Sequence, residues 1–338
     1  GFFFFFWRAA LSGATRLDRL AGHGYHCRRG RCRHRLEAKT HRSTPAPIPM
    51  RYNTLITVDQ FHALQQEHRP LMVFDCSYDL SDPAAGRRQF AQAHIPGARH
   101  ADLHDDLSSY RPGHSASGGR HPLPLPEDFA ATLRQWGFDN SMQAVVYDRN
   151  GCNYCGRLWW MLKWLGHDAV AILDGGLQAW QSAGHTVQAC AGNQQDIPAI
   201  SHFTLQPALV ELVSTETVAG SLSEQNMLLL DARGAPRYRG DIEPLDPAAG
   251  HIPGAINRPF ADNLQTDGRF KSATVLQQEL TNILPEKSPG KVVVYCGSGV
   301  SAIPTLLALE IAGYPRPALY AGSWSAWSST PGLPVERS

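Results

Sequence analysis

The chain has no run of about 18 consecutive apolar residues, the length that a membrane-spanning helix needs. Charge is also scarce, since 18% of the 338 residues are charged and 31 Lys and Arg stand against 30 Asp and Glu. Acidic residues are nearly missing from residues 1–49, which hold 2 of them beside 10 Lys and Arg, so the remainder carries 21 − 28 = −7. Because phosphate binding needs clustered cations, we expect neither a membrane nor a nucleic-acid partner.

An even-numbered disulfide framework is also missing, because the seven cysteines are irregularly spaced. This pattern favours reduced thiols and predicts a soluble, cytoplasmic protein in which one thiol is chemically active. A hydrophobic content of 43% is enough for a sizeable core, and the length favours two domains.

Residues 1–49 show no helix or strand period. Their positive charges follow the apolar start, the reverse of a secretory signal, and fit an Arg-rich transit peptide better. We interpret the segment as an unstructured or artefactual, upstream-translated extension, with a targeting segment or a basic tail as alternatives. Cys27 and Cys32 lie among three histidines at a spacing typical of no zinc finger, so we expect no metal site there.

One block of sequence occurs twice in the remainder. Each copy holds an apolar run ending in Asp, a His-Ile-Pro-Gly-Ala segment, an apolar run ending in Tyr and a segment from Gly to Trp. The copies lie at 71–75, 94–98, 144–147 and 175–180, and again at 227–231, 251–255, 292–295 and 322–327. A period this long predicts duplicated domains rather than a solenoid.

The strand-like runs are apolar throughout and alternate with helix-patterned stretches such as 158–165 and 306–311. Apolar strands separated by helices predict an α/β fold, in which each copy is a mostly parallel sheet flanked by helices. Residues 189–207 lose the pattern and predict a linker. We therefore expect domains at 50–188 and 208–338.

Cys296 directly follows the last apolar run of the second copy and begins a glycine-containing segment. Ser301 suits the N-cap of a following helix, Pro304 its first turn and Gly313 its stop. The glycines let successive backbone N–H groups face inward, and the helix N-terminus adds partial positive charge at the same place. This cradle favours a thiolate at Cys296 and predicts a nucleophile, provided that solvent reaches the sulfur.

The loop amides that would hold the anion are those of Gly297, Gly299, Val300 and Ser301. The alternative for Cys296 is a small buried residue at a strand end. The matching position in the first copy is Asp148, so we expect one catalytic half and one supporting half.

The duplicated block, both His-Ile-Pro-Gly-Ala segments and above all residues 296–302 resemble the two-domain rhodanese-type sulfurtransferases, over almost all of residues 50–338. The fold implied is two tandem rhodanese-like domains. Within that family, the Cys-Gly-Ser-Gly-Val loop is similar to that of the 3-mercaptopyruvate sulfurtransferases, whereas thiosulfate-preferring members carry a cation directly after the cysteine. Gly297 and Ser298 supply no charge to meet the thiosulfate dianion.

The resemblance implies that Cys296 takes a sulfur atom from 3-mercaptopyruvate, releases pyruvate and becomes a persulfide. The outer sulfur then passes to a thiol, such as thioredoxin or a low-molecular-weight thiol, or to cyanide. No cofactor and no metal are implied.

The resemblance also places residues 237–240 opposite the cysteine, where an arginine fork grips the donor carboxylate. Arg237 is the first candidate and Arg239 the second, and the alternative for each is a solvated surface charge. The family's second arginine follows a Glu-Pro pair, whereas Glu243-Pro244 is followed here by Leu245-Asp246.

Members of this group are described with a loop serine, a histidine and an acid that handle protons together. Ser298 fits the serine, His94 fits the histidine if the two halves pack face to face, and an acid near Asp82 would orient His94. The alternative is structural, with His94 and His251 each pinning the turn at the Pro-Gly that follows.

Cys152 and Cys155 have the spacing of a redox pair, but two ordinary thiols are the favoured interpretation. The tryptophans of the first copy are expected in packing rather than in a binding cage.

Three other functions are possible for such a chain. A thiosulfate:cyanide sulfurtransferase is the main alternative, and a non-catalytic rhodanese-type binding module is a lesser one. A cysteine phosphatase needs an arginine six positions after its nucleophile, where this chain has Ala302.

Overall fold

The structure is a computed structural model that describes residues 51–190, 201–284 and 291–338. The chain divides into a unit at residues 1–48 and a unit at residues 49–338, and everything below concerns the second. The expected extension, with Cys27 and Cys32, lies outside the described residues.

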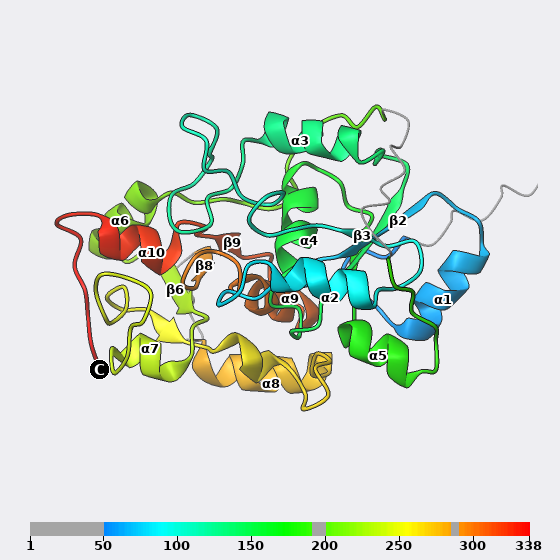
Figure 1. The fold of residues 1–338 in the computed structure, drawn as a ribbon. Coiled ribbons are helices and arrows are strands. Elements are labelled where there is room, and N and C mark those ends of the chain that lie inside the picture. The colour runs from blue at the N-terminus through cyan, green and yellow to red at the C-terminus, as the bar shows by residue number, and fades with distance from the viewer. Residues whose placement is uncertain (1–50, 191–200, 285–290) are drawn as a thin grey trace, which may run out of the picture. The chain divides into compact units, whose positions relative to one another are not determined.

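The first half of the described chain forms a parallel sheet with the strand order β1-β5-β4-β2-β3 (Figure 1). Its elements are β1 (Leu55–Ile56), α1 (Val58–Gln66), β2 (Leu71–Asp75), α2 (Ala85–Gln92), β3 (Arg99–His100), α3 (Pro126–Gln135), β4 (Gln143–Tyr147), α4 (Cys155–Trp164), β5 (Val170–Leu173) and α5 (Gly176–Ser182). Every residue of β4 and β5 is buried, as expected for strands covered on both faces.

The second half forms a parallel sheet with the order β7-β6-β8-β9. Its elements are α6 (Thr215–Glu224), β6 (Met227–Asp231), α7 (Ala235–Arg239), β7 (Ile256–Asn257), the 3₁₀ helix η1 (Phe260–Asn263), α8 (Ala273–Ile283), β8 (Lys291–Tyr295), α9 (Ile303–Ile311), β9 (Ala318–Leu319) and α10 (Ser323–Ser329). Asp231 pairs with Tyr295 at the ends of β6 and β8, as Asp75 pairs with Tyr147 in the first sheet.

Side chains alternate between two cores across each sheet. In β4, Val145 faces the core with α1 and α5, whereas Val146 faces the core with α4. The second of these cores continues into the other half, where it includes Val294 and Leu307, and α4 packs against α9. The expected fold of two parallel α/β halves is therefore confirmed, and their shared core places the end of β8 beside the first half.

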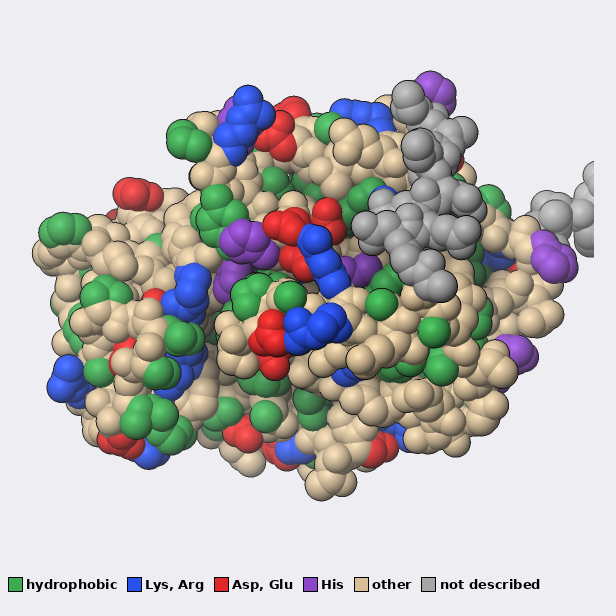
Figure 2. Space-filling view, viewed as in Figure 1, with side chains coloured by type: hydrophobic (Ala, Val, Ile, Leu, Met, Phe, Trp, Pro, Cys, Tyr) green, Lys and Arg blue, Asp and Glu red, His purple; other side chains and the backbone are tan. Residues whose placement is uncertain are grey.

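Part of the expected linker packs against the first half. Phe203 is 1% exposed and its ring lies 5.9 Å from that of Phe138. None of the helices in the described ranges has the length and hydrophobicity of a membrane span. On the face drawn in Figure 2, basic side chains are dispersed among acidic ones.

Candidate active site

Cys296 lies in the connection between β8 and α9, as the sequence predicts. Helix α9 has Ala302 at its N-cap rather than Ser301, Pro304 in its first turn, and Gly313 in a left-handed conformation just beyond its end. Ser301 makes no capping hydrogen bond and instead lines a cavity. Gly299 has φ +73, and a Cβ there would lie 2.4 Å from the Ala321 carbonyl oxygen, so the turn requires glycine.

The start of α10 holds the Cys296 loop in place. The Cys296 N–H donates to Ser323 Oγ at 3.1 Å, and the Trp324 and Ser325 N–H groups donate to the Cys296 and Gly297 carbonyls, each at 2.9 Å. Ser323 itself has φ +54, an uncommon conformation for a residue other than glycine. The loop is thus fixed from outside, while the N–H groups of residues 297–302 donate to no described residue.

A cavity of about 190 Å³ lies against this loop. Residues of both halves line it: Leu80, Arg120, Asn153, Tyr154, Arg233, Gly234, Arg237, Phe260, Gly297, Ser298, Val300 and Ser301. The Cys296 side chain is 1% exposed and is not among the residues that line the cavity, so the expectation that solvent reaches the sulfur is not met in this structure. The adjoining residues 297, 298, 300 and 301 do line it.

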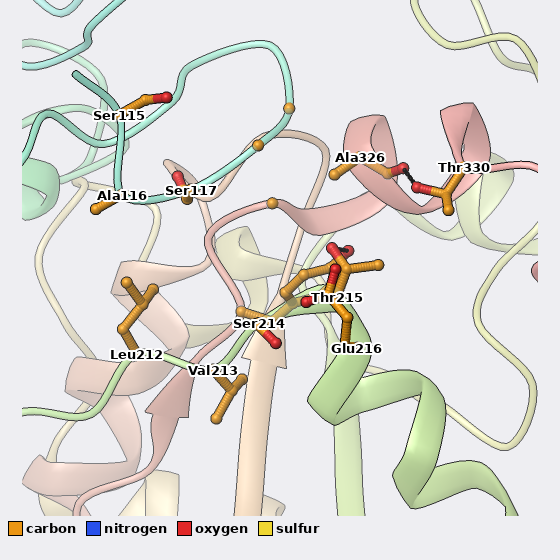
Figure 3. Close-up of a pocket in the computed structure, with 14 residues that line it drawn as sticks. Ser115, Ala116, Ser117, Leu212, Val213, Ser214, Thr215, Glu216, Ala326 and Thr330 are labelled. Carbon is orange, nitrogen blue, oxygen red and sulfur yellow. Dashed lines mark hydrogen bonds between the residues drawn. The ribbon is translucent and has the colours of Figure 1, made fainter. Parts of the chain in front are cut away.

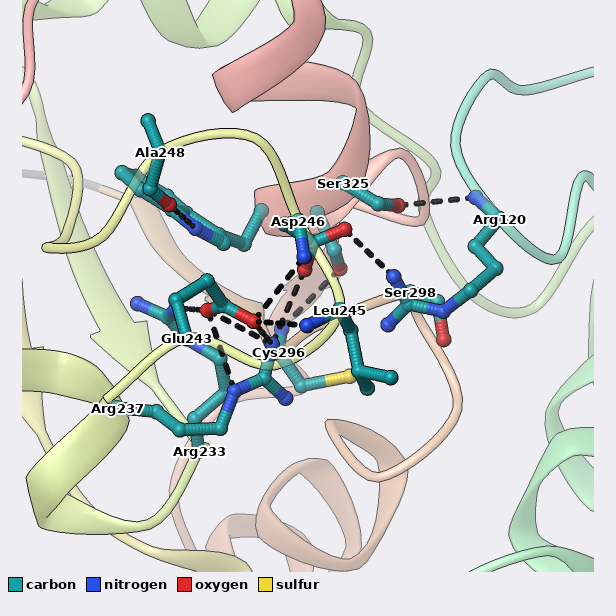
Figure 4. Close-up of polar contacts among 12 residues, drawn as sticks. Arg120, Arg233, Arg237, Glu243, Leu245, Asp246, Ala248, Cys296, Ser298 and Ser325 are labelled. Atoms are coloured by element: carbon teal, nitrogen blue, oxygen red, sulfur yellow. Dashed lines mark hydrogen bonds and ion pairs between the residues drawn. The ribbon is translucent and has the colours of Figure 1, made fainter. Parts of the chain in front are cut away.

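The structure separates the two arginines predicted to bind substrate. Arg237 lines the cavity and forms ion pairs with Glu243 at 2.7 Å and Asp246 at 3.0 Å. Arg239 is exposed and pairs with Asp241 at 2.7 Å, which matches the surface-charge alternative. Two further arginines line the cavity. Arg233 shares Glu243 with Arg237, and Arg120 of the first half shares Asp246 with it, at 2.5 Å (Figure 4).

The histidine beside Ser298 is His121, and the expected pairing of Ser298 with His94 is wrong. His121 Nδ1 lies 2.8 Å from Ser298 Oγ, and both side chains are buried. Burial, aided by the positive charges of Arg157 and Arg120, lowers the pKa of His121 to about 3. His121 is therefore neutral at neutral pH.

His94 instead has the structural role that was the alternative. Its Nδ1 lies 2.8 Å from the Phe90 carbonyl, its Nε2 lies 2.9 Å from Gln188 Nε2, and its ring stacks on Phe90. His251 makes the matching contacts in the second half, with Nδ1 at 2.8 Å from the Tyr238 carbonyl. Asp82 is exposed and pairs with Arg88, so it orients neither His94 nor His121.

Arg157 of α4 is a buried cation that the sequence did not single out. It is 0% exposed and donates to the Gly299, Leu107 and His121 carbonyls. Burial lowers the pKa of Arg157 to about 10, and the nearby Cys296 opposes this shift. Within the described ranges no carboxylate pairs with it, so its charge is directed at the Cys296 loop.

Cys152 and Cys155 are free and buried, beside the first half's counterpart of the loop. Burial raises the pKa of both thiols, which disfavours thiolate formation.

A larger cavity, of about 690 Å³, lies between residues 115–119 and the start of α6 (Figure 3). Serine, threonine and aliphatic side chains dominate its lining, and Glu216 is its charged member. Its lining includes no cysteine and no His, Lys or Arg side chain that would activate a hydroxyl group. The smaller cavity against the Cys296 loop is therefore the candidate active site.

Residues 57–183 and 214–330 each match the rhodanese-like domain family. A probable 3-mercaptopyruvate sulfurtransferase of Pseudomonas aeruginosa is 44% identical over 282 residues, which cover 83% of this chain and 97% of that protein. A putative thiosulfate sulfurtransferase of Mycobacterium tuberculosis, SseB, is 38% identical over 85% of this chain and 98% of its own. The crystal structure of SseA from Escherichia coli, described as showing the rhodanese fold of 3-mercaptopyruvate sulfotransferases, has a TM-score of 0.67 and 28% identity, covering 80% of this chain and 98% of that one.

The chain therefore belongs to the rhodanese family, with two rhodanese-like domains in tandem. It is an enzyme of the sulfurtransferase class, whose curated relatives are named for 3-mercaptopyruvate or thiosulfate.

Proposed function

We propose that the protein moves a sulfane sulfur from 3-mercaptopyruvate through a Cys296 persulfide to a thiol acceptor, and releases pyruvate. The observation that carries this proposal is the loop that follows Cys296, whose N–H groups from 297 to 302 have no partner among the described residues. Inward amides of this kind stabilise a sulfur anion before and after transfer.

In the first step, the Cys296 thiolate attacks the donor sulfur, an S–S bond forms and the donor C–S bond breaks. The electron pair of the broken bond stays on the pyruvate fragment as an enolate. The donor's thiol proton ends on the methyl carbon of pyruvate, which leaves a persulfide anion on Cys296. Atoms and charge balance without a metal or an external oxidant.

Ser298 and His121 are placed to carry that proton. Their 2.8 Å contact joins the loop to a histidine that is neutral at neutral pH. Because the lowered pKa of His121 disfavours the imidazolium, we propose that the pair passes the proton along its hydrogen bond rather than holding it on the ring. Arg237, which also lines the cavity, binds the donor carboxylate.

In the second step, an acceptor thiol attacks the outer sulfur, takes it as its own persulfide and restores the Cys296 thiolate. Thioredoxin or a low-molecular-weight thiol is the acceptor we propose, and cyanide is the laboratory substitute. Five free cysteines within the described ranges fit a reducing compartment, and we propose the cytoplasm.

Thiosulfate is the second candidate donor, because four relatives, two at 38% and two at 32% identity, are named for it. The cavity argues against it, since Arg237, Arg120 and Arg233 are each paired with acids and little positive charge is left for a dianion.

Steady-state rates of pyruvate release from 3-mercaptopyruvate, and of thiocyanate formation from thiosulfate and cyanide, rank the two donors. We expect the higher kcat/KM for 3-mercaptopyruvate, and the reverse ranking would overturn the donor assignment. Cys296→Ser should abolish transfer from both donors, whereas the control Cys190→Ser should keep it. Transfer by Cys296→Ser above a few per cent would remove Cys296 from the mechanism.

A further inference from the structure

Two arginines from different halves converge on the residue that follows the nucleophile. A Cβ built on Gly297 would lie 3.1 Å from Arg237 Nη1 and 3.2 Å from Arg120 Nη2. The glycine thus leaves the space that two guanidinium groups occupy. The residues that follow Cys296 in the sequence carry no charge, but the folded structure brings the positive charges of Arg120 and Arg237 to this position.

The nitrogens that face Gly297 are unpaired. The ion pairs of Arg120 use Nη1 and those of Arg237 use Nε and Nη2, so Arg120 Nη2 and Arg237 Nη1 donate to no described residue. Arg120 Nε is buried and also has no partner within the described ranges. Because buried N–H groups nearly always have acceptors, the buried Arg120 Nε indicates a missing partner. A bound anion can accept from the Arg120 and Arg237 donors that the described residues leave unused.

Asp246 orients both arginines. Its Oδ1 lies 2.5 Å from Arg120 Nη1, its Oδ2 lies 3.0 Å from Arg237 Nη2, and its side chain is 3% exposed. Figure 4 shows Arg120 and Arg237 approaching Asp246 from opposite sides. Glu243 accepts the Asp246 N–H at 3.2 Å and so fixes the turn that carries it.

Asp246 also sets the charge of the cavity. Arg120, Arg233 and Arg237 line it, and each forms an ion pair with one or more of Asp231, Glu243 and Asp246. The charges of these three arginines and three acids sum to zero. A monoanion entering such a site meets directed N–H donors without a surplus of positive charge.

Resting on the sulfur transfer proposed above, we propose that Arg120 of the first half and Arg237 of the second together bind the donor carboxylate above Gly297. Asp246 is the positioning residue that orients them, and it selects a monoanionic donor over a dianionic one by cancelling one positive charge. The chain thereby replaces the arginine that it lacks after Glu243-Pro244 with one from the other domain.

The first test compares Arg120→Gln and Arg120→Lys with Arg239→Ala, an exposed arginine outside the cavity. Loss of a charged hydrogen bond to the carboxylate should raise the KM for 3-mercaptopyruvate by about tenfold or more, with kcat changed less than about threefold. Arg120→Lys should recover part of this loss, and Arg239→Ala should match the wild type. An unchanged KM in Arg120→Gln would overturn the inference.

The second test is Asp246→Asn, which keeps the shape of the side chain and removes its charge. The added net charge attracts a dianion about twice as strongly as a monoanion. The ratio of kcat/KM for thiosulfate to that for 3-mercaptopyruvate should therefore rise about tenfold. A ratio that stays constant or falls would refute the selective role of Asp246.

Binding of pyruvate to Cys296→Ser protein, measured by titration calorimetry, separates this inference from the proposed function. If Arg120→Gln weakens pyruvate binding while the wild type forms no persulfide from 3-mercaptopyruvate, the carboxylate site stands and the proposed reaction fails. If the wild type forms the persulfide but adding Arg120→Gln to the Cys296→Ser protein leaves pyruvate binding unchanged, the reaction stands and the inference fails.

Discussion

The connection after β4 and the connection after β8 have the same place in two copies of one fold, yet different groups occupy them. In the first half, the buried Asp148 carboxylate accepts the N–H groups of Asn150, Cys152, Tyr154 and Cys155 at 2.8 to 3.1 Å. In the second half, Cys296 stands in that place and the following N–H groups have no described partner. In the first loop, several N–H groups therefore converge on one acidic side chain, whereas the N–H groups of the second loop are left available for a ligand.

Replacing the anchoring residue should affect stability in one half far more than in the other. Asp148→Ala leaves three buried N–H groups and the part-buried N–H of Asn150 without an acceptor, and we expect a loss of about 3 to 5 kcal/mol in the free energy of unfolding. Cys296→Ala removes a small buried side chain and should cost about 1 kcal/mol. Urea denaturation of both variants measures the difference, and equal losses would contradict the comparison.

Arg157 brings a buried positive charge from the first half to the second loop, where it donates to the Gly299 carbonyl. Arg157→Met removes the cation beside Cys296 and the donors to the Gly299 and His121 carbonyls, so kcat/KM for pyruvate release should fall about 100-fold. Arg157→Lys keeps the charge and should recover part of the activity. Wild-type kcat/KM in Arg157→Met would show that the loop does not depend on this charge.

His121 should give the protein an acid-sensitive stability. The unfolded chain takes up this proton near pH 6.5, whereas the folded chain takes it up only near pH 3, so unfolding becomes easier as the pH falls through this window. From pH 6.5 to pH 5 the loss due to His121 should be about 2 kcal/mol. His121→Gln should reduce the pH dependence of urea unfolding, compared with the exposed control His202→Gln. If the free energy of unfolding of His121→Gln falls with decreasing pH as steeply as that of the wild type, this assignment is wrong.

The smallest expected effect on stability concerns the residue at the start of the helix that follows each sheet's last strand, Gly176 in the first half and Ser323 in the second. Gly176 and Ser323 hold matching positions with φ of +59 and +54, but only Ser323 has a side-chain oxygen, which accepts the Cys296 N–H. Ser323→Ala keeps the strained conformation and loses the acceptor, so we expect a cost of about 1 kcal/mol. Ser323→Gly relieves the strain and should cost less than Ser323→Ala. Thermal unfolding tests this order, and the opposite order would refute it.

Much of the fold could be predicted from the sequence, because apolar strands and duplicated segments are local patterns. The runs at 71–75 and 227–231 are strands β2 and β6, and Cys296 lies at the predicted strand end. The helix cap was misplaced by one residue because Ser301 faces the cavity instead of the helix N-terminus.

The residues that the first half of the chain contributes to the site could not be predicted from such local patterns. Arg120 and His121 belong to a loop without a counterpart in the repeat, and only the packing of the two halves brings them to Gly297 and Ser298. One signal was present, since His94 to Ala144 spans 144 − 94 = 50 residues whereas His251 to Val292 spans 292 − 251 = 41. The longer connection of the first copy, between β3 and α3, carries Arg120 and His121.

Mass spectrometry of the peptides after brief exposure to 3-mercaptopyruvate tests the central claim most directly. The account predicts a mass gain of one sulfur atom on the peptide that contains Cys296, lost again when a thiol acceptor is added, and no gain on the peptide with Cys152 and Cys155. A sulfur atom found on another cysteine, or none on Cys296 while pyruvate is released, would contradict it.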